Sequence, residues 1–296
     1  MSQAPVVTAT APPAATPAAT PALTQAPVAT PVPGPDDSGF GIERAMADAR
    51  VLAVDIGNRE AGTPGDAEAA AYLAAELEEA GLIAQRRPFA LPQGGESWNV
   101  VGTPPDVDVE RDRYLIVGGH YDSLRGPGGN DNASGTAAAL EIARVLAARP
   151  ATLPVVFVAF GAEESQPVPG VAHHIGSIAY TDGMSQAARA NLVAMINLDM
   201  VGHGDTIILG HLGLGPEEAT ERLERIAREL GIGVRRMETP DWSDNGSFLK
   251  RGMNAGWLWS GDRPEKHSPQ DTFETIRTSD VARSGRLAIA TLRSYR

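Results

Sequence analysis

The chain has 296 residues, of which 42% are hydrophobic, so it is long enough to bury a substantial core. Its formal net charge is -12 and it lacks a block of basic residues interleaved with aromatics, which argues against a nucleic-acid partner. It has no cysteine, which excludes disulfides and thiolate metal ligands and leaves only nitrogen and oxygen ligands. No apolar run approaches the roughly 18 residues that a membrane span needs.

Residues 1–39 are predicted to be an extended linker. The first 35 residues contain no charged or aromatic residue and hold nine of the 23 prolines. Such a tract cannot bury enough apolar surface to offset the entropy lost on ordering. Ala/Pro/Thr-rich tracts are typical of exported proteins, so we expect a location in the cell envelope or outside the cell, with the cytoplasm as the alternative. No export signal is visible in this chain.

Residues 40–296 are predicted to form one domain of the α/β class. We expect helices at 42–54, 66–80, 134–148 and 216–230 and from about 279, with Asp66 as the N-cap of the second. We predict strands near 83–90, 98–102, 113–118, 154–160, 192–198, 206–209, 233–237 and 255–259. Apolar strands alternating with helices indicate a mostly parallel sheet that is covered on both faces.

Candidate metal ligands follow several of these strands. His120 ends the apolar run LIVGGH, where a histidine is more often structural than a ligand. Asp122 follows two residues later, close enough to accept the second ring N–H of His120, as carboxylates do behind zinc-bound histidines. Asp131 lies in the turn GGNDNASG, which by itself reads as a loop with a helix cap. Beside a metal site, Asp131 could give one oxygen to each of two cations roughly 3.5–4 Å apart.

Two adjacent carboxylates, Glu163 and Glu164, follow the buried run VVFVAF. An exposed loop would explain them equally well. Near a metal ion, Glu164 could be a ligand while Glu163 takes the proton of metal-bound water, whose pKa falls towards about 7. Asp199 follows another apolar strand, and His267 lies in a polar loop. Five ligand-type residues and one spare carboxylate in such positions favour a metal-dependent hydrolase.

The remaining histidines receive no role. His173 and His174 lie in a Pro/Gly-rich loop and are expected to be exposed. His203 and His211 flank a short predicted strand.

These motifs together resemble the co-catalytic di-zinc aminopeptidases of metallopeptidase family twenty-eight. The resemblance runs from about Gly62 to the C-terminus and rests on five motifs in a specific order: GGHYDS, NDNASG, FGAEE, NLDM and HSPQDT. It implies a mixed, mainly parallel eight-stranded sheet between helices, as in zinc exopeptidases. It also implies two zinc ions and peptide substrates with a free N-terminus.

The resemblance assigns roles to residues of this chain. One zinc ion would be held by His120, Asp131 and Asp199, and the other by Asp131, Glu164 and His267. Glu163 would be the general base for the attacking metal-bound hydroxide and then the proton donor to the leaving amine, and Asp122 would orient His120. Lys266, directly before His267, stands where well-studied members of the family often have a tyrosine that helps to stabilise the tetrahedral intermediate; it could supply a cationic donor there or point to solvent.

Three alternatives stay open at this point. One is a glutaminyl cyclase-like zinc acyltransferase, against which Lys266 argues because those enzymes tend to place aromatic residues beside the last ligand. Another is a carboxypeptidase-type relative. The third is a non-catalytic binding domain, which the presence of Glu163 and all five ligand candidates disfavours.

Overall fold

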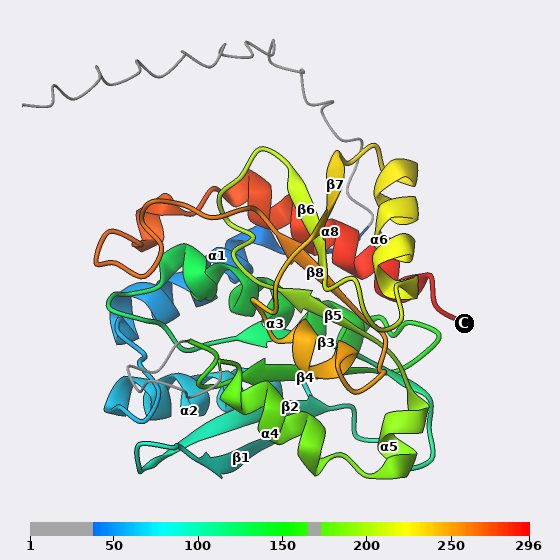
Figure 1. Cartoon of the computed structure of the whole chain (residues 1–296), viewed down its shortest axis with the longest axis horizontal. Helices are drawn as coiled ribbons and strands as arrows, with labels where there is room; N and C mark the ends of the chain where they lie inside the picture. Colours follow the sequence, from blue (N-terminus) through cyan, green and yellow to red (C-terminus); the bar gives the residue numbers. More distant parts are fainter. Residues whose placement is uncertain (1–37, 165–172) are drawn as a thin grey trace, which may run out of the picture. The chain divides into compact units, whose positions relative to one another are not determined.

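The strands of the computed structural model, which describes residues 38–164 and 173–296, form one mixed eight-stranded sheet (Figure 1). The predicted fold class is confirmed. In spatial order the strands are β1 (Ile83–Ala90), β2 (Glu96–Thr103), β4 (Val155–Phe160), β3 (Tyr114–His120), β5 (Leu192–Leu198), β8 (Ala255–Trp259), β6 (Ile207–His211) and β7 (Val234–Glu238).

The four central strands, β4, β3, β5 and β8, run parallel to one another, whereas β2 and β6 on either side of them are antiparallel to β4 and β8. The carboxyl ends of these strands therefore meet at one edge of the sheet, which is where open α/β sheets bind ligands. Their tight spacing explains the glycines before His120: a Cβ on Gly118 would lie 1.8 Å from the Val158 carbonyl oxygen, and one on Gly119 would lie 2.2 Å from that of Leu198.

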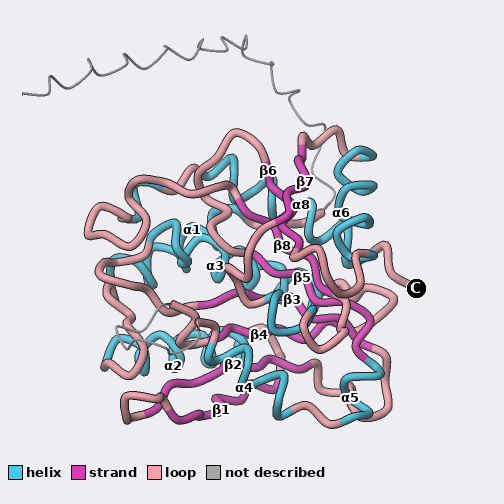
Figure 2. The backbone as a smooth tube through the Cα atoms, viewed as in Figure 1, coloured by secondary structure: helices cyan, strands magenta, loops and turns pink. Residues whose placement is uncertain are grey.

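Helices cover both faces of the sheet (Figure 2). The apolar period of two along β3 directs Leu115 and Val117 into one buried cluster and Ile116 into another. The first cluster includes residues of α1 (Ile42–Arg50), α2 (Pro64–Glu79), α3 (Gly135–Ala148), α6 (Glu218–Glu229) and α8 (Thr278–Arg293). The second lies under α4 (Ile175–Gly183) and α7 (Asn245–Leu249), while α5 (Gln186–Asn191) leads into β5.

Three details of the predicted elements differ from the structure. Thr63, not Asp66, is the N-cap of α2, because its hydroxyl accepts the Asp66 backbone N–H. The Asp66 carboxylate is instead buried and accepts hydrogen bonds from Gly62 N (2.7 Å) and the Tyr121 hydroxyl (2.6 Å). The first helix continues beyond α1 as a π-helical turn, η1 (Val51–Ile56). The short helices α4, α5 and α7 were not predicted, since none has a long apolar period.

Most of the predicted linker, residues 1–37, lies outside the described residues, so the linker and the export of the chain stay predictions. Across residues 38–164 and 173–296, no helix has both the length and the apolar character that a membrane span requires.

Candidate metal centre

Strand ends place four of the predicted site residues. His120 is the last residue of β3, and Asp199 directly follows β5. The pair Glu163 and Glu164 comes a few residues after β4. Because β4, β3 and β5 are parallel neighbours, these side chains converge at the same edge of the sheet.

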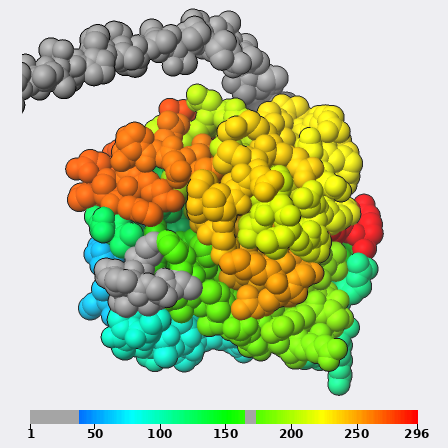
Figure 3. Space-filling view, in the orientation of Figure 1, coloured from blue at the N-terminus to red at the C-terminus, as the bar shows by residue number. Residues whose placement is uncertain are grey.

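Two loops bring the other ligand candidates to this edge. Asp131 lies in the π-helical turn η2 (Gly129–Ser134), which Asp271 holds: its Oδ1 accepts the Asn130 N–H at 2.7 Å and its Oδ2 the Asp131 N–H at 2.9 Å. His267 lies in the segment between β8 and the 3-10 turn η3 (Phe273–Thr275). That segment, orange in Figure 3, lies on the surface of the molecule, and the His267 side chain is 32% exposed.

The Asp131 carboxylate lies between the two histidines. Its Oδ1 is 3.2 Å from His120 Nε2, and its Oδ2 is 3.3 Å from His267 Nε2. His120 Nε2 is also 3.3 Å from Asp199 Oδ1, and His267 Nε2 is 2.8 Å from Glu164 Oε2. All five ligand candidates therefore meet around one bridging carboxylate.

Glu163 closes one side of this cluster. A ligand-type atom from each of His120, Glu163 and Asp199 lies within 4.8 Å of the others. The same holds for His120, Asp131 and Glu164. Side chains that are remote in sequence thus form two groups that share His120. In each group the nitrogen and oxygen atoms are close enough together to bind one metal ion.

The electrostatics of the cluster fit bound cations. Four carboxylates, those of Asp131, Glu163, Glu164 and Asp199, are each at least 95% buried. Burial and the charge of Asp131 raise the pKa of Glu164 well above its usual range. Burial opposes protonation of His120, but the charges of Glu163 and Asp199 outweigh it and raise the pKa of the imidazole. Buried negative charge of this density needs compensation, and divalent cations can supply it in place of protons.

The geometry of individual atoms agrees with this fit. Asp131 Oδ2 and His267 Nε2 are buried atoms that lie close together, yet neither makes an aligned hydrogen bond within the described part of the chain. Because these two atoms lie 3.3 Å apart without a hydrogen bond, both are suited to bind the same cation. Imidazole and carboxylate are zinc-type ligands.

Asp122 acts on this cluster from behind. Its carboxylate accepts the backbone N–H of Glu163 at 3.0 Å and of Glu164 at 3.2 Å. His120 Nδ1 lies 3.2 Å from the backbone oxygen of Asp122 and 3.5 Å from its carboxylate. Asp122 thus links the end of β3 to the loop after β4, in addition to facing the second ring nitrogen of His120.

Sequence reasoning assigned no role to three residues that support the cluster. Ser243 donates to Asp199 Oδ2 at 2.6 Å. Asp271 holds the Asp131 turn, as described above. Asn132 joins two strand ends, because its amide donates to the carbonyl oxygens of His120 (3.1 Å) and Leu198 (3.0 Å). Asn132 and Asp271 lie in the NDNASG and HSPQDT motifs, but the contacts of all three residues come from elements far apart in the chain.

The prediction for His174 was wrong. This residue is 2% exposed, and its Nε2 lies 3.0 Å from Glu163 Oε1. It was predicted to be exposed because it follows a Pro/Gly-rich stretch. Its burial results instead from the return of the chain to Glu163, where the His174 N–H donates to the Glu163 carbonyl oxygen at 2.9 Å.

Arg59 is a fully buried cation behind the centre. Its guanidinium donates to five backbone carbonyl oxygens, those of Leu52, Gly57, Tyr121, Pro127 and Gly128. Burial lowers the pKa of Arg59 to about 10, against the opposing charge of Asp122. Arg59 therefore fixes the loop that runs from the end of β3 to the Asp131 turn.

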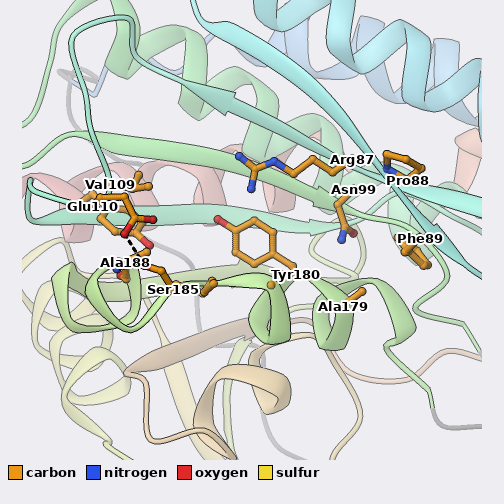
Figure 4. Close-up of a pocket in the computed structure, with 13 residues that line it drawn as sticks. Arg87, Pro88, Phe89, Asn99, Val109, Glu110, Ala179, Tyr180, Ser185 and Ala188 are labelled. Carbon is orange, nitrogen blue, oxygen red and sulfur yellow. Dashed lines mark hydrogen bonds between the residues drawn. The ribbon is translucent and has the colours of Figure 1, made fainter.

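A pocket of about 260 Å³ lies elsewhere, between β1, β2, α4 and α5 (Figure 4). The Tyr180 ring of α4 lies in this pocket, and the Arg87 guanidinium is 6.0 Å from its centre. None of the seven candidate residues lines this pocket. It is therefore separate from the metal cluster.

Comparison with known proteins identifies the family. Residues 99–292 match the model of Peptidase family M28. The chain belongs to this family.

Among relatives of family M28, the chain is 30% identical over 205 residues to aminopeptidase YwaD of Bacillus subtilis, a match that covers 66% of this chain and 44% of YwaD. It is 34% identical over 182 residues to an aminopeptidase of Pseudomonas aeruginosa, covering 56% and 31% respectively. The chain thus spans less than half the length of these relatives.

Solved structures share the M28 fold. A zinc aminopeptidase from Bacillus subtilis superposes with a TM-score of 0.78 at 18% identity, covering 86% of this chain and 95% of that one. A glutaminyl cyclase from Bacteroides thetaiotaomicron superposes with a TM-score of 0.74 at 20% identity, and the match covers 87% of this chain and 99% of the cyclase chain. At these identities the likeness shows the architecture, and the chemistry must be argued from the residues.

Proposed function

We propose that this chain is a zinc-dependent aminopeptidase that removes N-terminal residues from peptides. The observation that carries the proposal is the Asp131 carboxylate, which lies with one oxygen 3.2 Å from His120 and the other 3.3 Å from His267. Family M28 membership and the aminopeptidases among its relatives support the same activity. The single-domain organisation of residues 40–296 is part of this proposal.

Five residues would hold two zinc ions. His120, Asp131 and Asp199 would hold one, and Asp131, Glu164 and His267 would hold the other. When bound, the ions would polarise the scissile carbonyl and acidify the attacking water. The centre is buried except on the side of His267, so a peptide would reach it from the surface that carries this loop.

Proton transfer falls to Glu163. Its carboxylate is beside His120 and Asp199 but is not needed as a ligand in either proposed trio. It can take a proton from the attacking water and pass it to the leaving amine. Asp122 fixes the backbone of Glu163 through the 3.0 Å hydrogen bond, so the base stays near the reacting atoms.

The test is hydrolysis of a panel of aminoacyl p-nitroanilides by the purified chain, with metal analysis of the same sample. We expect cleavage that a chelator abolishes and zinc restores, with about two metal ions per chain. N-acetylated leucyl p-nitroanilide is the matched control and should not be cleaved if a free amine is required. Absence of cleavage of every free aminoacyl substrate by the zinc-loaded protein would exclude the aminopeptidase.

The same samples separate the alternatives. Cyclisation of an N-terminal glutamine with about one zinc per chain would indicate a glutaminyl cyclase. Release of C-terminal residues from N-blocked peptides would indicate a carboxypeptidase-type relative. Metal binding without any of these reactions would indicate that the chain is a non-catalytic binding domain.

A further inference from the structure

His174 is a buried side chain that none of the roles above uses. The structure describes the chain up to Glu164 and again from residue 173. His174 lies beside the loop that carries Glu163. Two backbone hydrogen bonds join these segments: His174 N donates to Glu163 O and Ile175 N donates to Ala162 O, both at 2.9 Å. These bonds hold the backbone of His174 next to that of Glu163.

The His174 ring lies between two carboxylates. Its Nε2 is 3.0 Å from Glu163 Oε1, and its Nδ1 is 3.8 Å from Asp241 Oδ2. The N–H at Nε2 does not point straight at the Glu163 oxygen, so this contact is a close ion pair and not a linear hydrogen bond. Asp241 is also paired with Lys250. Burial opposes protonation, but the charge of Glu163 outweighs it and raises the pKa of His174 to about 9.

The backbone of His174 is in an unusual conformation. It has φ 64° and ψ 35°, in the left-handed region where a Cβ crowds the following carbonyl oxygen. A glycine would occupy this position without that crowding. Strain kept at a buried, charged side chain beside a reacting group is a reason to look for a role of that side chain.

We propose that His174 is a positioning residue for Glu163 in the hydrolysis proposed above. A glutamate side chain has three rotatable bonds, so its carboxylate is not held in one position unless other groups contact it. The contact of His174 with Oε1 fixes one carboxylate oxygen and leaves the other to face the water and the leaving amine. Displacing such a group by about 1 Å is enough to lower a rate on the order of 10²-fold.

The proposal is tested with His174→Leu and His174→Gln. Leucine fills similar space but cannot contact the carboxylate, whereas the amide nitrogen of glutamine can take the place of Nε2. We expect kcat to fall about 10- to 100-fold in His174→Leu with KM changed less than about threefold. His174→Gln should recover most of kcat. In His174→Ala, added imidazole should raise kcat by refilling the space beside Glu163.

His211→Gln is the matched control, because His211 is also a histidine near a carboxylate, with its Nδ1 3.8 Å from Glu217. It should retain wild-type kcat. Zinc content and thermal midpoint are measured for every variant and should remain at wild-type values. An equal loss of kcat in the leucine and glutamine variants together with a lower thermal midpoint would reduce His174 to a structural residue. An unchanged kcat in His174→Leu would remove it from the reaction.

A crystal structure of His174→Leu gives a readout that does not depend on turnover. We expect the Glu163 side chain to occupy more than one rotamer in the variant and a single rotamer in the wild type. A single, unchanged rotamer in both would overturn the proposal. If the wild-type protein cleaves no peptide substrate, the proposed function fails, and the rotamers of Glu163 still decide whether His174 positions it.

Discussion

The Ser243 hydroxyl donates to Asp199 Oδ2 at 2.6 Å, and the Asn197 side-chain amide donates to the same hydroxyl oxygen at 2.7 Å. This chain of two bonds ties the carboxylate after β5 to the segment before α7. The bond occupies Oδ2 and leaves Oδ1, which lies 3.3 Å from His120 Nε2, to face the metal cluster. Ser243 thus decides which oxygen of Asp199 is presented to a cation.

Ser243→Ala should therefore weaken metal binding. The substitution frees Asp199 to rotate and leaves the Asn197 amide without its acceptor. Loss of a partner behind a metal ligand typically costs 10- to 100-fold in affinity or activity, and we expect a loss of this size. Competition with a zinc-chelating dye measures it. Ser279→Ala, at the exposed start of α8, is the control and should keep the zinc affinity of the wild type. A wild-type zinc affinity in Ser243→Ala would show that Ser243 is not needed to orient Asp199.

Glu163→Gln separates catalysis from metal binding. Glutamine has nearly the same shape but cannot accept the proton of the attacking water. We expect an unchanged zinc content and a loss of kcat of several orders of magnitude, because general base catalysis and the following protonation of the leaving amine are both lost. Metal analysis and aminoacyl p-nitroanilide kinetics on one sample measure the two effects. Retained turnover would remove Glu163 from the mechanism.

Arg59→Met should strongly destabilise the fold. It removes five hydrogen bonds to carbonyl oxygens and leaves the buried oxygen of Tyr121 and the half-buried oxygens of Gly57 and Pro127 without this donor. Each unsatisfied buried group costs about 1–3 kcal/mol, so we expect a loss of at least 3 kcal/mol in the free energy of unfolding, measured with urea. Arg59→Lys keeps the charge but not the planar set of donors, so its free energy of unfolding should lie between those of the wild type and Arg59→Met.

The control for this prediction is Arg225→Met, because Arg225 is on the exposed face of α6 and pairs only with Glu229 among the described residues. Its effect should stay within about 0.5 kcal/mol. Equal stabilities of the Arg59 and Arg225 variants would show that the five hydrogen bonds contribute little.

Asp66 predicts a pH dependence of stability. Burial raises its pKa to about 6, against the opposing hydrogen bond from Tyr121. An acid whose pKa is higher in the folded than in the unfolded chain binds a proton on folding between about pH 4 and 6. Its contribution to stability therefore falls as pH rises through that window, by about 2–3 kcal/mol in all. Asp66→Asn should lack this component.

The measurement is urea unfolding of wild type and Asp66→Asn between pH 4.5 and 6.5. The difference in stability between the two proteins should change with pH in this range, whereas that for Asp106→Asn, at an exposed position, should not. A constant difference for Asp66→Asn would mean that Asp66 stays ionised in the fold.

The sequence by itself determined the class of fold and the candidate metal ligands. All eight strands were predicted, and the central ones, such as β3 and β4, are apolar runs of strand length, which is a local property of the sequence. The ligand candidates His120 and Asp199 could be found for the same reason: each follows a strand that its own residues define. The spacing of the five motifs was specific enough to indicate family M28.

Only the tertiary structure decided the supporting contacts. Ser243 and Asp199 are 44 residues apart, and Asp271 and Asp131 are 140 apart, so no local pattern could pair them. The burial of His174 likewise depends on where the chain returns after residue 172, whereas its composition suggests an exposed loop. Periodicity reports which face of an element is buried, but which polar groups meet across the core depends on how strands and loops from the whole chain are packed together.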